Sequence, residues 1–166
     1  HPVEAIGRDQ SIQGLEAGFT ASSMLTCTDC HNSEESRAGN LPRGPHGSVY
    51  EPILAREYQI GDPSMESFQS YALCYRCHNR SALLSGGAFP HRTHVVDQQT
   101  SCVVCHDAHG SRQSPFLVNF LLRGKAGNEV VKASSSGKLE FRSSGRGRGT
   151  CFLTCHGSNH DPKEYP

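Results

Sequence analysis

Residues 102–106 read Cys-Val-Val-Cys-His, two cysteines that are separated by two residues and followed directly by histidine. The chain has eight cysteines, which form four such close pairs, and a histidine follows the second cysteine of every pair. The motifs at 27–31, 74–78 and 102–106 share the spacing C-x-x-C-H, and the motif at 151–156 has one more residue between its cysteines. The cysteines are Cys27, Cys30, Cys74, Cys77, Cys102, Cys105, Cys151 and Cys155.

The C-x-x-C-H spacing is the attachment signature of c-type haem, in which two thiols bond the porphyrin and the adjoining histidine reaches the iron. Three alternatives compete: zinc sites with four cysteine ligands, structural disulfides and thioredoxin-like redox chemistry. None of them requires a histidine after every second cysteine, so we expect four covalent haem c groups. Their proximal iron ligands are expected to be His31, His78, His106 and His156.

Four haem irons leave four sixth coordination positions. Met24 and Met65 are the only methionines, so bis-histidine ligation at all four irons is the simplest hypothesis. It implies low-potential, closed sites that carry electrons without binding substrate. Six histidines remain for these positions, two more than the irons need, and a surplus histidine could ligate a haem in an adjacent subunit.

The candidate distal ligands differ in their local context. His46 lies on the tight turn at 44–48, where little backbone bulk obstructs a flat porphyrin. His91 and His94 are three residues apart, so on a helical turn they share a face and could reach two neighbouring haems. His109 follows proximal His106 too closely to cross to the far face of the same porphyrin, and it would ligate another haem. Two further candidates are His160, in the same relation to His156, and His1, the weakest because it lies on a free terminus.

The sequence offers little apolar material for a conventional core. Leu, Ile, Val and Phe together number 32 of 166 residues, a level at which a chain normally cannot offset its ordering entropy. We therefore expect one domain over residues 1–166 that is mostly irregular, with stacked haems as its core. Short helices are expected at the attachment motifs, especially over 66–78 and 97–106, and a β-hairpin is expected to pair 130–132 with 139–141.

Residues 111–150 form a basic insert, with eight basic and two acidic side chains. One hypothesis is that the insert pairs with haem propionates or with an acidic face of a neighbouring subunit, and the alternative is a solvated loop. Nucleic-acid binding is not expected, because Phe141 is the only aromatic residue at 123–149. No membrane span is expected either, since the longest apolar run, 116–122, falls short of the roughly 20 residues needed.

The chain resembles multihaem cytochromes c of the doubled C-x-x-C-H class, which include tetrahaem electron carriers. The stretches at 44–48, 72–78, 89–110 and 149–162 carry this resemblance. The Phe-x-His-x-x-His element at 89–94 is similar to one in small cytochromes c₃, whose two histidines serve different haems. Cytochromes c₃ also tolerate longer cysteine spacings, which implies a fourth covalent haem at Cys151 and Cys155.

The resemblance implies an electron carrier rather than an enzyme, matured and located outside the cytoplasm, in the periplasm or extracellular space, with any signal peptide already removed. Its partners would be other redox proteins or extracellular electron acceptors. Some members of the class polymerise into filaments in which the next subunit supplies a distal histidine, and we expect a filament subunit here. The alternatives are a discrete periplasmic shuttle, a nitrite- or hydroxylamine-type redox enzyme with one open iron, and a zinc-stabilised binding module.

Overall fold

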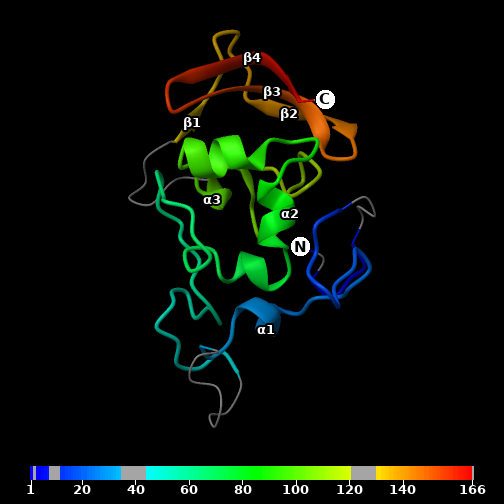
Figure 1. The fold of residues 1–166 in the computed structure, drawn as a ribbon, viewed down its shortest axis with the longest axis vertical. Helices are drawn as coiled ribbons and strands as arrows, with labels where there is room; N and C mark the ends of the chain where they lie inside the picture. The colour runs from blue at the N-terminus through cyan, green and yellow to red at the C-terminus, as the bar shows by residue number, and fades with distance from the viewer. Residues whose placement is uncertain (2, 8–11, 35–43, 121–129, 166) are drawn as a thin grey trace.

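The structure, a computed structural model, describes residues 1, 3–7, 12–34, 44–120 and 130–165. Much of this chain is irregular, as the composition predicts, and its regular elements are short. A small sheet lies at one end of the long axis, and the helix at the first motif lies toward the other (Figure 1). Among the described residues, no helix is long and apolar enough to cross a membrane.

The first three cysteine motifs each form one turn of helix, as expected. The elements are α1 (Cys27–Cys30), the 3₁₀ helix η1 (Cys74–Arg76) and α3 (Cys102–Cys105). In each motif the histidine N–H donates to the carbonyl of the first cysteine, at 2.8, 3.0 and 2.9 Å in chain order. Two further turns lie between motifs: α2 (Arg80–Leu84), capped by the Asn79 side chain, and the π-helix η2 (Thr93–Asp97).

The longer helices predicted over 66–78 and 97–106 are wrong in extent. Backbone groups in the first segment bond elsewhere: the Leu73 N–H donates to the Glu57 carbonyl at 3.0 Å, and the Ser70 carbonyl accepts from Gln59 at 2.7 Å. The second segment is interrupted at Gln99, whose φ of 54° is left-handed. Long-range backbone pairing and one left-handed residue therefore override the local helical preference.

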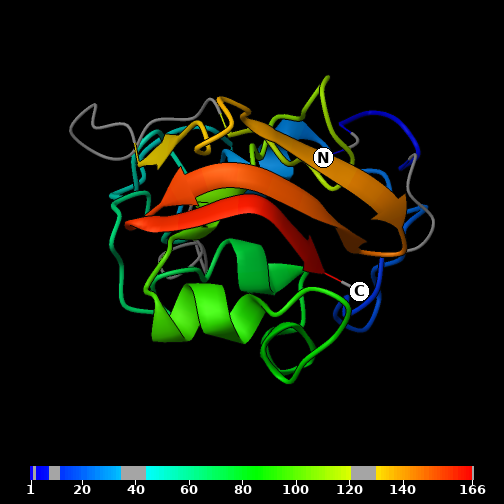
Figure 2. The ribbon, with the colours of Figure 1, turned by 90° about the horizontal axis from the view of Figure 1, so that it is seen from above.

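The sheet has four antiparallel strands, where the sequence predicted a single hairpin. They are β1 (Val131–Lys132), β2 (Glu140–Gly145), β3 (Arg148–Cys155) and β4 (Ser158–Tyr165). The two predicted strand segments do not pair with each other, because both pair with β3. Since β4 pairs along the other edge of β3, β1 and β2 lie end to end on the same edge, as Figure 2 shows.

Two tight turns create this topology. Arg146 and Gly147 connect β2 to β3 with φ values of 52° and 75°, and His156 and Gly157 connect β3 to β4 with 48° and 77°. Two consecutive left-handed residues are typical of type I′ turns, whose twist matches that of paired strands. The fourth cysteine motif therefore lies on a strand and its histidine in a turn, unlike the other three motifs.

The largest buried cluster lies against the inner face of the sheet. It combines Val104 of α3 with Cys151 and Leu153 of β3 and Tyr165 of β4. On β3, Phe152 points the other way, and Lys138 and Arg142 lie over its ring at 4.7 and 4.9 Å. Residues 151, 153 and 155 therefore share the inner face, as strand alternation requires. Of the basic insert, residues 121–129 lie outside the described residues.

Gly149 is a buried residue of β3, paired with Ser143 of β2, and it has no room for a side chain. A Cβ atom there would lie 2.4 Å from Cε2 of Phe141 and 2.6 Å from the Arg142 carbonyl oxygen. We expect Gly149→Ala to lower the free energy of unfolding by about 1–3 kcal/mol, the usual cost of overpacking. Thermal denaturation would measure the effect, with Ser144→Ala on exposed β2 backbone as the control. Equal melting temperatures for the two variants would contradict the packing described.

Candidate functional site

The four cysteine motifs lie in sequence order through the molecule. Motifs one and two are joined by Arg76, which donates to the Asp29 carbonyl. Motifs two and three meet at Cys74 and Cys102, which are close enough that Cys102 lowers the pKa of the Cys74 thiol and Cys74 raises that of the Cys102 thiol. Motifs three and four are also close, because Val104 and Cys151 belong to one buried cluster against which Cys105 and Cys155 pack. Burial, and then the nearby Cys155 and Cys151, raise the pKa of Cys105 to about 12. In Figure 1 the motifs follow one another from α1, in the lower half of the view, to β3 in the sheet.

The first three motifs share a second feature, an antiparallel bridge at the histidine. His31 bridges to Leu54, His78 to Leu15 and His106 to Val118. The backbone leaves the helical turn at the histidine and becomes extended, for example at His106 with φ −112° and ψ 128°. Each motif histidine is thereby held against a second segment of chain.

The same bridges position the imidazole rings. Nδ1 of His31 lies 3.1 Å from the Pro52 carbonyl oxygen, and Nδ1 of His106 lies 2.8 Å from the Phe116 carbonyl oxygen. In both cases the acceptor lies two residues before the bridge partner. An Nδ1–H that donates to a carbonyl leaves the lone pair on Nε2, which is the arrangement typical of metal-binding histidines.

Eight of the ten histidines form four ring pairs. His31 pairs with His109 at 6.1 Å between ring centroids, His78 with His1 at 6.1 Å, and His106 with His91 at 6.4 Å. In the fourth pair, His94 and His160 are 6.3 Å apart. Each of the first three pairs joins a motif histidine to one distant in sequence.

These distances fit two imidazoles on one iron. Ring centroids on opposite sides of an iron lie about 6.2 Å apart, because each nitrogen–metal bond is about 2.0 Å and each centroid lies about 1.1 Å behind its nitrogen. Burial also favours the neutral, ligating form of the imidazoles. It lowers the pKa of His78 and His106, and burial together with nearby His106, His94 and His78 lowers the pKa of His91 to about 4.

The cysteines of these three motifs are also placed to bond a haem. Thiols three residues apart on a helical turn lie on one face, next to the histidine that follows. All eight cysteines are free in the structure. A tetrahedral zinc site needs four ligands, but nowhere in the described chain do three or more His, Cys, Asp or Glu side chains gather to hold a metal ion.

The fourth motif has a different geometry. Cys151 and Cys155 are four residues apart on β3, which places their Cα atoms on the order of 13 Å from each other in extended chain. Attachment of both thiols to one porphyrin therefore requires this segment to shorten. Nε2 of His156, the expected ligating nitrogen, lies 2.9 Å from Oδ2 of the buried Asp62. Oδ1 of Asp62 accepts from the Ser101 N–H at 2.7 Å, so this carboxylate is held in place.

His46 stands apart from the ring pairs. It lies on the predicted turn, where Gly47 has a left-handed φ of 70°, and its imidazole is exposed. The structure thus brings His1, His91 and His109 to motif histidines and leaves His46 at the surface. Sequence reasoning ranked His1 last, because nothing local signals a partner that lies 77 residues away.

Comparison of the chain with protein-family models, with curated proteins and with solved structures finds no match.

Proposed function

We propose that this chain is a multihaem cytochrome c that transfers electrons and catalyses no reaction of its own. The observation that carries this proposal is the set of three motifs in which a cysteine pair, an anchored histidine and a second imidazole at 6.1–6.4 Å lie together. Haem, when bound, supplies one-electron chemistry at its iron. A fourth haem is proposed at Cys151 and Cys155.

The chain's own residues perform two tasks in this function. The paired imidazoles would hold a haem iron between them, and this would leave no position for an exogenous ligand. The motifs themselves are spaced closely and in order along the long axis, which supports a relay that runs from end to end of the molecule (Figure 1). Haems held at this spacing would also supply the core that the aliphatic residues are too few to form.

The first test asks whether every haem iron is closed to added ligands. We expect the optical spectra of the oxidised and reduced protein to remain unchanged on addition of cyanide, carbon monoxide or nitrite, because no axial position is open. A shift in the Soret band with any of the three would instead favour a redox enzyme with a displaceable ligand. A colourless protein would favour the zinc-stabilised module.

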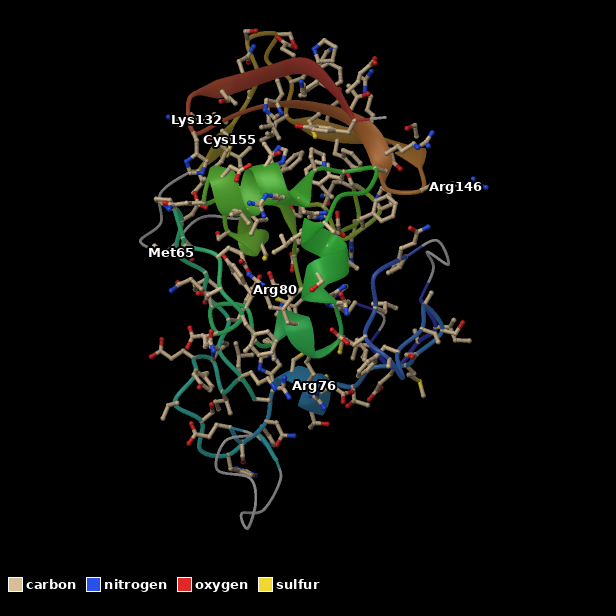
Figure 3. The ribbon with its side chains drawn as sticks, viewed as in Figure 1. Met65, Arg76, Arg80, Lys132, Arg146 and Cys155 are labelled. Carbon is tan, nitrogen blue, oxygen red and sulfur yellow. The ribbon has the colours of Figure 1, made fainter. Side chains whose placement is uncertain are left out.

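We further propose that copies assemble head to tail into an extracellular filament, with a discrete periplasmic shuttle as the alternative. Two observations support assembly through the ends. The segment 44–56, with its exposed His46, lies toward the end of the long axis opposite the sheet (Figure 1). At the sheet end, Lys132 and Arg146 project outward on either side (Figure 3).

The basic insert provides a test of this assembly. Arg146 and Arg148 are exposed, whereas Arg142 bonds Glu140 at 2.6 Å and covers Phe152. If the insert docks on an acidic face, replacing Arg146 and Arg148 together by Ser should shorten or abolish filaments seen by electron microscopy. Arg92→Ser, also at an exposed position, is the control. If the unmodified protein forms only monodisperse particles at high concentration, the filament proposal is refuted. If the double variant forms filaments like those of the unmodified protein, the proposed docking role of the insert is refuted.

A further inference from the structure

We infer that Asp107 is a positioning residue that presents a second imidazole to each of the first two cysteine motifs. The inference rests on the proposed function and deepens it, because it assigns to one side chain the closure of two centres to which that side chain supplies no ligand. It is carried by the contacts of the short segment 106–110, which begins at the histidine of the third motif.

This segment carries the second imidazole of the first motif. His109 pairs with His31 at 6.1 Å between ring centroids and 6° between ring planes. His106, three residues earlier, belongs to a different ring pair. Because only two residues separate His106 from His109, the turn between them decides where the His109 ring lies.

The same segment holds the second imidazole of the second motif. The Ala108 carbonyl oxygen lies 2.9 Å from Nδ1 of His1, whose ring pairs with His78 at 6.1 Å between centroids. An Nδ1–H that donates to this carbonyl leaves the lone pair on Nε2, as at His31 and His106. The placement of the His1 ring therefore depends on the direction of the Ala108 carbonyl.

Asp107 fixes this turn through its side chain and its backbone. Its Oδ1 accepts from the His109 N–H at 2.9 Å, and its Oδ2 accepts from Nδ2 of Asn119 at 3.3 Å. Its N–H donates to the Leu117 carbonyl at 2.9 Å, and its carbonyl accepts from the Gly110 N–H at 3.1 Å. The carboxylate therefore joins the turn to the chain segment that packs beside it.

An asparagine occupies the equivalent position after the first two motif histidines. Oδ1 of Asn32 accepts from the Gly44 N–H at 2.8 Å, and Oδ1 of Asn79 accepts from the Ala82 N–H at 2.8 Å. An amide and a carboxylate both supply the oxygen that such side-chain turns need. Asparagine is therefore the conservative replacement for Asp107.

Little else holds the His109 ring in place. Its side chain is 83% exposed, so packing contributes little to its position. Without the Asp107 oxygen, the His109 N–H loses its acceptor and the turn regains conformational freedom. His109 should then leave His31, and the Ala108 carbonyl should turn away from His1, so that one axial position opens at each of two centres.

Carbon monoxide binding to the reduced holoprotein counts open irons and tests this inference. We expect Asp107→Ala to bind carbon monoxide at two more haems per chain than the unmodified protein, and Asp107→Asn to bind no more than the unmodified protein. His109→Ala and His1→Ala each remove one imidazole, so each should open one haem and calibrate the count. Fewer than two newly opened haems in Asp107→Ala, or equal binding by the alanine and asparagine variants, would overturn the inference.

Asp161→Ala is the matched control for a general loss of stability. Asp161 also accepts hydrogen bonds, from the Ser135 hydroxyl and the Ser136 N–H, each at 2.6 Å, but it lies on β4 at the sheet end of the molecule. Its replacement should lower the melting temperature without opening a haem at the first two motifs. If Asp161→Ala opens as many haems as Asp107→Ala, the inference is refuted.

A milder variant keeps the inference testable if Asp107→Ala does not fold. Asn119→Ala removes only the hydrogen bond to Oδ2 of Asp107 and leaves the bond to the His109 N–H. We expect it to bind carbon monoxide at a fraction of the haems that His109→Ala and His1→Ala open. Binding equal to that of the unmodified protein would then overturn the inference.

The haem content separates this inference from the proposed function. An intact mass without added haem would refute both. An intact mass with four haems, together with an Asp107→Ala protein that opens no haem, would refute only the role of Asp107.

Discussion

The denatured protein is expected to be about 2.5 kDa heavier than its 18.1 kDa chain, because each of the four proposed covalent haems would survive unfolding and add roughly 0.6 kDa. Zinc would be lost on denaturation, since its affinity depends on the folded ligand set. An excess of about 1.9 kDa would mean that one motif carries no haem. The fourth motif would be examined first, because its cysteines lie on a strand. No excess would refute the cytochrome.

Paired cysteine variants locate each haem. Cys102→Ala with Cys105→Ala should lower the intact mass by one haem, as should Cys151→Ala with Cys155→Ala. The second variant is the informative one, because these two cysteines lie on β3 rather than on a helical turn. If its mass falls only by the atoms removed from the side chains, the three helical motifs account for all attached haem.

A distal-ligand substitution should produce the largest change in potential. His91→Met places a thioether beside His106, and a His/Met pair stabilises ferrous iron more than a His/His pair does. We expect one haem to rise by on the order of 0.1–0.3 V, within the range that axial ligands span. Spectroelectrochemical titration would measure it.

Arg92→Met is the control for this experiment, because Arg92 is exposed and adjoins His91 in the sequence. Its four potentials should match those of the unmodified protein. Unchanged potentials in His91→Met would refute the pairing of His91 with His106. A raised potential in His46→Met would show that His46 ligates an iron in a neighbouring copy.

Sequence reasoning predicted the local part of the candidate site and missed the strands around it. Short helices at the first three motifs and a mostly irregular chain are both confirmed. The predicted hairpin was wrong because β1 and β2 each pair with β3, which contains the fourth cysteine pair. One signal of this sheet was available: Arg146-Gly147 and His156-Gly157 are two-residue turns with glycine second, each followed by a strand.

The spacing of cysteine and histidine alone determined the geometry of the first three motifs. The hydrogen bond that closes each turn spans only four residues, from His31 to Cys27 for example, so no distant segment is needed to form it. The same locality explains why the chemistry of these motifs could be predicted from the sequence. Each contains its own pair of thiols and its own imidazole.

Tertiary structure alone decided which imidazoles meet. His1 reaches His78, and His109 reaches His31, although 77 and 78 positions of sequence separate them. Bridges such as Leu15 to His78 set these distances, and no periodicity in the sequence encodes them. The fourth motif shows the same dependence: β3 pairs along both edges, which extends residues 151–155 and carries His156 to Asp62. Pairing with the adjacent strands β2 and β4 therefore outweighs the local tendency of this motif to form a helical turn.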